Sequence, residues 1–308
     1  MSASAKANWI AVDWGTSHLR VAAINTDGSV HKWRRSDRGM GKLNPSEFEP
    51  ALMDLISDWL SDTQRTDVIC CGMVGARQGW LETPYRSSPC QPIAETAGTR
   101  IDTKNPRINV SVVPGIKQAH PPDVMRGEET QIAGLLALQP KFDGVVCLPG
   151  THSKWVHVSA GEIVSFATYM TGEVFALLAK QSVLRHSIAH EGWDNDSFLT
   201  ALDDAIAKPK MFAARLFSLR AENLVADLSP EIARSRLSGF LIGLELAASR
   251  PYWLGNNVAL CGASAVSRAY EQALVAQGLK PIILDTDQVT IAGLGVARVR
   301  LVGKKGPK

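Results

Sequence analysis

A turn sequence near the N-terminus, GTSHLRV at residues 15–21, returns in altered form as GTHSKWV at residues 150–156. Each copy follows an apolar run and is followed by further strand-like runs with turn residues between them, which predicts a β-meander at each place. A chain of 308 residues suits two medium-sized domains better than a single core. The repeated meander therefore predicts an α/β protein with two related domains.

The residue types in the two turns favour phosphate binding. Glycine lets a ligand approach the backbone closely, and the adjoining hydroxyl residues offer N–H and O–H donors for phosphate oxygens. Two such hairpins on either side of a cleft would hold a polyphosphate from both sides, whereas a duplicated hairpin without chemistry is the simpler alternative. The candidate phosphate-binding residues are Gly15, Thr16, Ser17, Gly150, Thr151 and His152.

Only the first copy has an acid before its turn, Asp13, where the second copy has Leu148. One carboxylate beside phosphates is a common way for a protein to hold Mg²⁺, which keeps most of its waters. We therefore expect Asp13 to be the metal ligand. The basic residues at matching positions, Arg20 and Lys154, are expected to add charge against the phosphates, with ordinary strand positions as the alternative.

A third glycine-containing turn, LCGASAV at residues 260–266, follows a predicted strand and opens a predicted helix. It lacks the spacing of a dinucleotide fingerprint, and the chain has no GxxxxGK[ST] loop. After two phosphate hairpins this turn fits the adenosine part of ATP, although tight strand-to-helix packing alone would also explain it. The candidate residues are Gly262, Ala263 and Ser264.

Composition limits the class of protein. With 45% hydrophobic residues, 20% charged residues and a net charge of +3, the chain is typical of a soluble globular protein and has no nucleic-acid footprint. No apolar run is long enough to span a membrane, and residues 1–9 lack a secretory apolar core, so we expect no membrane partner and a cytoplasmic location. Five cysteines without CxxC spacing are expected to be reduced, buried thiols.

The rest of the chain gives a coarser pattern. Residues 87–122 are rich in proline and predict loop and crossover around one strand at Asn109 to Val113. Residues 172–249 predict a helix-rich insertion. We place the domain boundary at residue 122, which gives domains of residues 1–122 and 123–308.

Four segments together resemble the 2-dehydro-3-deoxygalactonokinase family, within the sugar kinase and actin superfamily: VDWGTSHLR, RGEETQI, PGTHSKW and TGEVFALL. The first resembles the superfamily's first phosphate motif and PGTHSKW its second, while LCGASAVSRAY occupies the adenosine position and IAGLGVAR fits the second connecting helix. The resemblance covers residues 9 to about 301. It implies two ribonuclease-H-like (actin-like ATPase) domains around a central cleft.

The resemblance also implies an activity. This is ATP-dependent phosphorylation of the 6-hydroxyl of 2-dehydro-3-deoxy-D-galactonate, a phosphotransferase reaction with an alcohol acceptor. ATP and Mg²⁺ are the implied cofactors, and a small-molecule sugar acid is the implied partner. A homodimer is left open.

Roles for further residues follow from the same resemblance. Related kinases begin a helix with Gly-Asp just before the second phosphate motif, and this chain has Gly127-Glu128-Glu129 there. We expect Glu128 to accept the hydroxyl proton, with Glu129 as the alternative; both acids could also merely stabilise the first helical turn. The loop GMVGARQGW lies where relatives bind substrate, and an arginine can hold a carboxylate through two hydrogen bonds. The candidate substrate-binding residues are Arg77, Gln78 and Arg126.

Other functions stay open at this point. An actin-like ATPase switch would hydrolyse ATP without a sugar and report to a partner protein. A sugar-sensing module would bind without catalysis. A kinase could also act on another sugar or sugar acid such as 2-dehydro-3-deoxygluconate, since one stereocentre separates the two epimers.

Overall fold

A computed structural model describes residues 6–95 and 98–302 of the chain. The chain forms two compact units. Of the described residues, the first comprises 6–95, 98–142, 159–165 and 285–302, and the second comprises 143–158 and 166–284.

A mixed six-stranded sheet in the order β3-β2-β1-β4-β7-β6 forms the centre of the first unit. Its strands are β1 (Trp9–Trp14), β2 (Leu19–Ile24), β3 (Val30–Ser36), β4 (Thr66–Gly72), β6 (Thr99–Ile101) and β7 (Ile108–Val112). The first three strands pair antiparallel as a meander, while β4 runs parallel to β1 and β7 parallel to β4. The meander expected at the N-terminus is therefore confirmed.

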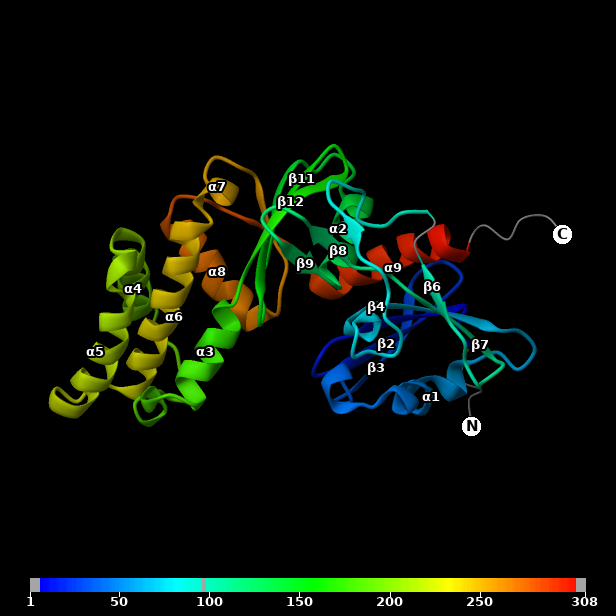
Figure 1. Cartoon of the computed structure of the whole chain (residues 1–308), viewed down its shortest axis with the longest axis horizontal. Helices are drawn as coiled ribbons and strands as arrows, with labels where there is room; N and C mark the ends of the chain where they lie inside the picture. Colours follow the sequence, from blue (N-terminus) through cyan, green and yellow to red (C-terminus); the bar gives the residue numbers. More distant parts are fainter. Residues whose placement is uncertain (1–5, 96–97, 303–308) are drawn as a thin grey trace. The chain divides into compact units, whose positions relative to one another are not determined.

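Helices cover both faces of this sheet. Alternate residues of β1 point to opposite faces, so that Ile10 packs with helix α1 (Phe48–Ile56) and Ala11 packs with helices α2 (Glu128–Leu138) and α9 (Thr286–Val302). Figure 1 shows α1 and α9 on opposite sides of the strands. Short 3-10 turns connect these elements: η1 (Met40–Lys42), η2 (Pro45–Glu47), η3 (Ser57–Trp59) and η4 (Met73–Gly75).

A small second sheet is formed by strands at the two ends of the region expected to be loop. It joins β5 (Arg86–Ser87), β8 (Ile116–Gln118) and β9 (Asp123–Met125), with β5 parallel to β8 and β8 antiparallel to β9. The strand expected at Asn109 to Val113 is present as β7, but the expectation that it is the single strand between residues 87 and 122 was wrong, because β6 and β8 also lie there. These two strands have three residues each and are too short to show an alternating pattern. The end of β9 leads directly into Arg126 and the start of α2, so this sheet fixes where that helix begins.

The second unit is built on a sheet with the same opening pattern, although residues 159–165 of its β11–β12 hairpin are counted with the first unit. Its strands, in the order β12-β11-β10-β13-β14, are β10 (Gly144–Leu148), β11 (Ser153–Ser159), β12 (Glu162–Tyr169), β13 (Val258–Leu260) and β14 (Ile282–Ile283). β11 pairs antiparallel with β10, and β13 runs parallel to β10. This is the β2-β1-β4 arrangement of the first sheet, so the repeat seen in the sequence is a repeat of the fold.

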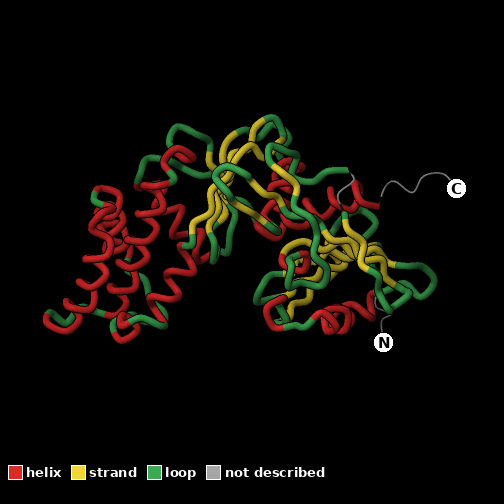
Figure 2. The backbone as a smooth tube through the Cα atoms, viewed as in Figure 1, coloured by secondary structure: helices red, strands yellow, loops and turns green. Residues whose placement is uncertain are grey.

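Helices make up the rest of the second unit. They are α3 (Thr171–Lys180), η5 (Val183–His186), α4 (Asn195–Ala207), η6 (Pro209–Met211), α5 (Phe212–Val225), α6 (Pro230–Ala248), α7 (Arg250–Trp253) and α8 (Ser264–Ala276). Figure 2 shows α3 to α6 gathered as one helical block. The expected helix-rich stretch of residues 172–249 is confirmed.

The two compact units divide the chain at a different place from the expected boundary at residue 122. Helices α2 and α9, which that boundary put in the second domain, pack with each other and with the sheet of the first unit. The reason is that both helices carry apolar faces that fit the uncovered face of the first sheet. The assignment of separate roles to residues 1–122 and 123–308 stays a proposal.

The cysteines and the helices each bear on a broad expectation from the sequence. All five cysteines are free thiols, and all but the half-buried Cys90 are buried. Over residues 6–95 and 98–302, no helix has both the length and the apolar character needed to cross a membrane.

Candidate functional site

A pocket of about 180 Å³ lies at the carboxyl ends of β1 and β4 in the first unit. Four of the residues singled out in the sequence line it together: Asp13, Gly15, Arg126 and Glu128. The remaining lining residues are Cys71, Gly72, Met73, Gly127, Gln131 and Thr290. The carboxyl ends of neighbouring parallel strands are a usual place for ligands in α/β sheets, which makes this pocket the candidate site.

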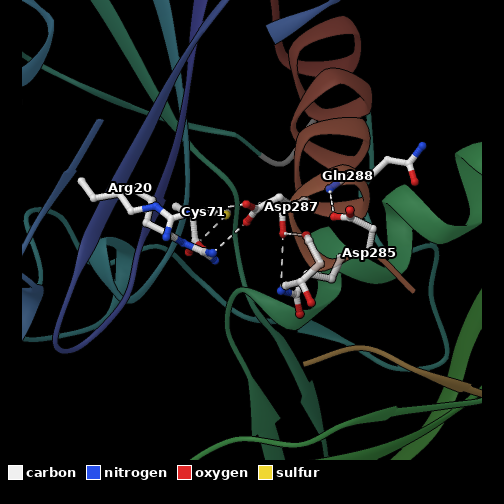
Figure 3. Close-up of polar contacts among 10 residues, drawn as sticks. Arg20, Cys71, Asp285, Asp287 and Gln288 are labelled. Carbon is white, nitrogen blue, oxygen red and sulfur yellow. Dashed lines mark hydrogen bonds and ion pairs between the residues drawn. The ribbon is translucent and has the colours of Figure 1, made fainter. Parts of the chain in front are cut away.

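Asp13 is held at the pocket by an ion-pair network. Arg20, opposite Asp13 on β2, donates from Nε to Asp13 Oδ2 at 3.1 Å and also pairs with it through Nη2. The same guanidinium reaches Asp287 Oδ1 at 2.9 Å. Figure 3 shows Arg20 reaching toward Asp287 at the start of α9. Arg20 therefore connects the strand that carries the acid to a helix 267 residues away in sequence.

The donor set at Asp13 fits a metal bound mainly through phosphates and water. Among the described residues, no cluster of three or more His, Cys, Asp or Glu could hold an ion on its own. A single half-buried carboxylate beside a glycine turn is what Mg²⁺ needs when a nucleotide supplies most other ligands. Arg20 holds the Oδ2 atom of Asp13. Among the hydrogen bonds of the described residues, the Oδ1 atom has only a long contact of 4.0 Å with the Cys71 thiol, so Oδ1 is the oxygen more available to a metal.

The two glutamates at the start of α2 have different surroundings. Glu128 lines the pocket, and its Oε2 accepts a hydrogen bond from the Arg126 backbone N–H at 2.9 Å. Glu129 is 0% exposed, and it accepts from the Gly127 N–H at 2.7 Å and from the Thr130 hydroxyl at 2.9 Å. Only Glu128 is therefore placed to meet a ligand in the pocket.

The turn before α2 depends on glycine. Gly127 has a φ of +112°, and a Cβ there would lie 3.3 Å from the Cα of Gly72, which itself has a φ of +88°. Both values lie in the region that L side chains rarely adopt. The end of β4 and the start of α2 can approach this closely, and so share one pocket, because neither residue has a side chain.

Burial gives Glu129 a distinctive titration. Desolvation, with a smaller contribution from the charge of Glu128, raises the pKa of Glu129 from 4.5 to about 7. Such an acid holds its proton more tightly in the folded chain than in the unfolded chain. Its contribution to stability is therefore complete below pH 4.5 and is lost as the pH rises through about 7.

Replacing Glu129 with glutamine should remove this pH dependence. The glutamine side chain keeps one acceptor and stays neutral, so the variant should gain stability over the wild type as the pH rises, reaching about 3 kcal/mol above pH 7. Urea unfolding of both proteins at pH 5 and pH 8 measures the difference. Equal pH slopes for the two proteins would show that Glu129 is ionised throughout.

Arg126 is a buried cation in the wall of the pocket. It is 8% exposed and lies over the ring of Tyr85, 4.3 Å from the guanidinium carbon to the ring centroid. Its Nη1 donates to the Thr83 hydroxyl and its Nη2 donates to the Thr83 carbonyl at 3.0 Å, while its Nε has no partner among the described atoms. Because both partners are neutral, the positive charge is left to attract an anion from the pocket.

The loop after β4 places the other two substrate candidates differently. Arg77 is 81% exposed and pairs with Glu82 at 3.5 Å, and Gln78 is also exposed. Neither residue lines the pocket that contains Asp13 and Glu128. Substrate binding by Arg77 and Gln78 stays a prediction.

Backbone hydrogen bonds from the segment that follows β3 hold the first predicted phosphate hairpin in place. The Met40 N–H donates to the Gly15 carbonyl at 3.0 Å, and the Gly41 N–H donates to the Thr16 carbonyl at 2.9 Å. Thr16 and Ser17 are exposed. The hairpin thus has a fixed backbone and free side chains, which suits the predicted contact with phosphates.

The second predicted phosphate loop, residues 149–152, lies against the start of α3. The Glu173 N–H donates to the Thr151 carbonyl at 2.9 Å, and His152 Nε2 lies 2.5 Å from Glu173 Oε2. A Cβ on Gly172 would lie 2.2 Å from the Gly150 carbonyl oxygen, so only glycine allows this contact. A helix N-terminus favours anions, and here one adjoins the loop.

The predicted adenosine turn lies beside that loop. A Cβ on Gly262 would be 2.9 Å from the Pro149 carbonyl oxygen, so the turn and the phosphate loop are neighbours within the second unit. Ala263 is exposed and precedes α8, whose first residue is Ser264; the Ser264 side chain lies outside the described part of the chain. Lys154 is buried, and its Nζ donates to the Thr168 hydroxyl at 3.1 Å. A phosphate contact of Lys154 stays a prediction.

Several residues that line the first unit's pocket or contact its side chains gave no signal in the sequence. Asp287 and Thr290 belong to α9, where they look like ordinary residues of a first helical turn. Cys71 looks like a buried strand residue, and Thr83 like part of a loop. The fold brings Asp287 to Arg20, Cys71 to Asp13, Thr83 to Arg126 and Thr290 to the pocket wall, and only then do they become recognisable.

Comparison with known proteins agrees with these features. A family model described as 2-keto-3-deoxy-galactonokinase matches residues 13–297. A Rhizobium meliloti protein assigned as 2-dehydro-3-deoxygalactonokinase DgoK1 is 38% identical over 299 residues, covering 94% of this chain and 96% of the relative. The Escherichia coli 2-dehydro-3-deoxygalactonokinase is 32% identical over 291 residues, covering 94% and 96%.

Solved structures support the fold. A Sinorhizobium meliloti protein described as a 2-dehydro-3-deoxygalactonokinase has a TM-score of 0.87 and 36% identity, covering 94% of this chain and 98% of its own. An activator of 2-hydroxyisocaproyl-CoA dehydratase from Clostridium difficile has a TM-score of 0.51 at 11% identity, with 97% and 99% covered, and shows the fold alone. The predicted α/β actin-like fold and phosphotransferase class are confirmed. The chain belongs to the 2-keto-3-deoxy-galactonokinase family, as its two turn motifs and the acids of its pocket had indicated.

Proposed function

We propose that this protein transfers the γ-phosphoryl group of ATP to the 6-hydroxyl of 2-dehydro-3-deoxy-D-galactonate. The observation that carries the proposal is one pocket lined by three kinds of group: the acid Asp13 for a metal, the buried cation Arg126 for a carboxylate, and Glu128 for a hydroxyl proton. A sugar acid with a free primary hydroxyl matches the last two. The relatives' names supply the identity of the acid.

The residues of the pocket have separate roles in this reaction. Arg126 holds the substrate carboxylate and so orients the sugar chain. Glu128 accepts the proton of the hydroxyl as its oxygen attacks phosphorus. Gly15, Thr16 and Ser17 offer donors to the phosphate oxygens, and Arg20 keeps Asp13 in place. Mg²⁺ bound near Asp13 would neutralise charge on the transferring phosphates.

The second unit supplies further groups for ATP in this proposal. The loop at Gly150, Thr151 and His152 contacts phosphates, and the turn at Gly262, Ala263 and Ser264 contacts the adenosine. Their support is that the two segments are neighbours and that α3 begins against the first of them. Lys154 is assigned a secondary contribution of charge.

A substrate panel tests the activity. Purified protein with ATP and Mg²⁺ should release ADP with 2-dehydro-3-deoxygalactonate, and phosphorus NMR should place the phosphate on the 6-hydroxyl. The gluconate epimer should react more slowly. Absence of acceptor-dependent ADP release across sugars and sugar acids would overturn the proposal, and steady hydrolysis without acceptor would favour an ATPase switch, which the family match does not favour.

The two candidate arginines can be separated by mutation. Arg126→Met should raise the KM for the sugar acid by about 30- to 100-fold, because charge-assisted hydrogen bonds to a carboxylate are lost, and should leave the KM for ATP within about twofold. Arg77→Met is the matched control and should change either KM by less than about twofold. Steady-state kinetics of both variants decide the point. A larger effect at Arg77 would transfer the carboxylate site to the loop after β4.

The proposal extends to the location, partners and oligomeric state of the protein. We assign the protein to the cytoplasm, with ATP and a sugar acid as its small-molecule partners and Mg²⁺ as its metal. A homodimer is consistent with a metabolic kinase of this size, and sedimentation of the purified chain would establish its state.

A further inference from the structure

A buried carboxylate lies at the centre of the second unit. Glu245, on α6, is 3% exposed. Its Oε1 accepts a hydrogen bond from Trp155 Nε1 at 2.8 Å, and its Oε2 accepts from the Tyr270 hydroxyl at 2.7 Å and from the Thr171 hydroxyl. The Tyr270 hydroxyl also lies 2.8 Å from the Ser153 hydroxyl. One acid thus joins four side chains in a closed network.

The partners of Glu245 are neutral, which makes the carboxylate an expensive choice for packing alone. Burial raises the pKa of Glu245, and the hydrogen bonds it accepts oppose that shift. Replacing buried charged groups with apolar residues of similar size is often neutral or stabilising. The acid is therefore better explained by the side chains it orients than by stability.

Those side chains are attached to three segments of the second unit. Two are the phosphate loop and the adenosine turn assigned to ATP, and the third is the start of α3, which packs on the phosphate loop. Ser153 and Trp155 begin β11, directly after the loop 149–152. Thr171 is the first residue of α3, whose next residue packs on the Gly150 carbonyl. Tyr270 is on α8, which begins after the turn at Gly262. Each donor to Glu245 is thus attached to a different part of the proposed nucleotide site.

We propose that Glu245 is a positioning residue for nucleotide binding, which fixes the phosphate loop, the start of α3 and the adenosine turn in one arrangement. The inference rests on the proposed function, since it takes these segments as the ATP site. Loops held in place before the ligand arrives lose less freedom on binding, so affinity rises without any contact from Glu245 itself. The sugar-acid pocket belongs to the first unit and should be unaffected.

The central experiment compares Glu245→Leu with Glu245→Gln. Leucine removes every acceptor, so the Kd of a non-hydrolysable ATP analogue, measured by calorimetry without sugar, should rise about tenfold or more. Glutamine can accept from Trp155 and donate to the rotatable hydroxyls of Thr171 and Tyr270, so it should restore the Kd to within about threefold. In steady-state assays well below the melting temperature, the KM for ATP should rise while the KM for the sugar acid stays within about twofold.

Matched variants separate positioning from general stability. Ser235 is on the same helix and fully buried, and its hydroxyl accepts from the Asp194 N–H at 2.8 Å, away from the three segments. Ser235→Ala should lower the melting temperature without changing the nucleotide Kd. Should Glu245→Leu fail to fold, Thr171→Val removes one donor and should raise the Kd about threefold to tenfold.

The outcomes are distinct. A nucleotide Kd for Glu245→Leu equal to that of the wild type, or equal losses for ATP and the sugar acid, would overturn the positioning role and leave Glu245 as a core residue. Failure of the wild type to bind nucleotide at all would instead overturn the proposed function and the inference together.

Discussion

Glu128→Gln should lower kcat by about 10³-fold while leaving the KM for ATP and for the sugar acid within about threefold. The expected loss is large because Glu128 is the glutamate that lines the pocket with Asp13, and its removal leaves the attacking hydroxyl without a proton acceptor. The glutamine carbonyl can still accept the hydrogen bond from the Arg126 N–H, so the start of α2 should keep its geometry. Rapid-quench measurement of a single turnover would show whether the chemical step is the one that slows.

Glu129→Gln is the matched control for this result. The two residues are adjacent and chemically identical, but Glu129 is fully buried and bonded to Gly127 and Thr130. A pKa near 7 would suit a general base, yet a base must first reach the proton, and geometry comes before pKa. Glu129→Gln should therefore keep kcat within about threefold. The reverse ranking, with Glu129→Gln the slower enzyme, would make Glu129 the base.

The architecture could be predicted because its signal is local and occurs twice. The turn residues at 15–21 and 150–156 mark the first hairpin of each sheet, and apolar runs on either side set the strands. Short-range chemistry of this kind does not depend on the rest of the fold.

What could not be predicted depends on tertiary contacts. No sequence pattern connects Arg20 to Asp287, because the pair forms only when α9 returns to the first sheet. The same return explains why the expected boundary at residue 122 differs from the compact units. Arg77 and Arg126 cannot be distinguished from the sequence. Only their burial in the fold shows that Arg77 faces solvent while Arg126 lies in the wall of a pocket. Long-range packing decides each of these cases.

Asp13→Asn should lower kcat/KM by about 10³-fold or more, because the only acid of the predicted phosphate turns would be lost as a metal ligand. Asparagine is nearly isosteric, and its carbonyl can still accept from Arg20, so the hairpin should fold. The variant should also lose the dependence of nucleotide affinity on Mg²⁺, which calorimetry with and without the ion measures independently of turnover.

Asp287→Asn isolates the metal role of Asp13 from its role as a partner of Arg20. Asp287 binds the same guanidinium but is not among the residues lining the pocket, and its side chain is 40% exposed. Its loss removes one side of the network while Asp13 keeps its charge, so kcat/KM should fall by less than about fivefold. If the two variants were equally impaired, the carboxylate of Asp13 would matter only as an anchor for Arg20. A large difference, together with lost Mg²⁺ dependence in Asp13→Asn alone, identifies Asp13 as the acid that the nucleotide-bound metal requires.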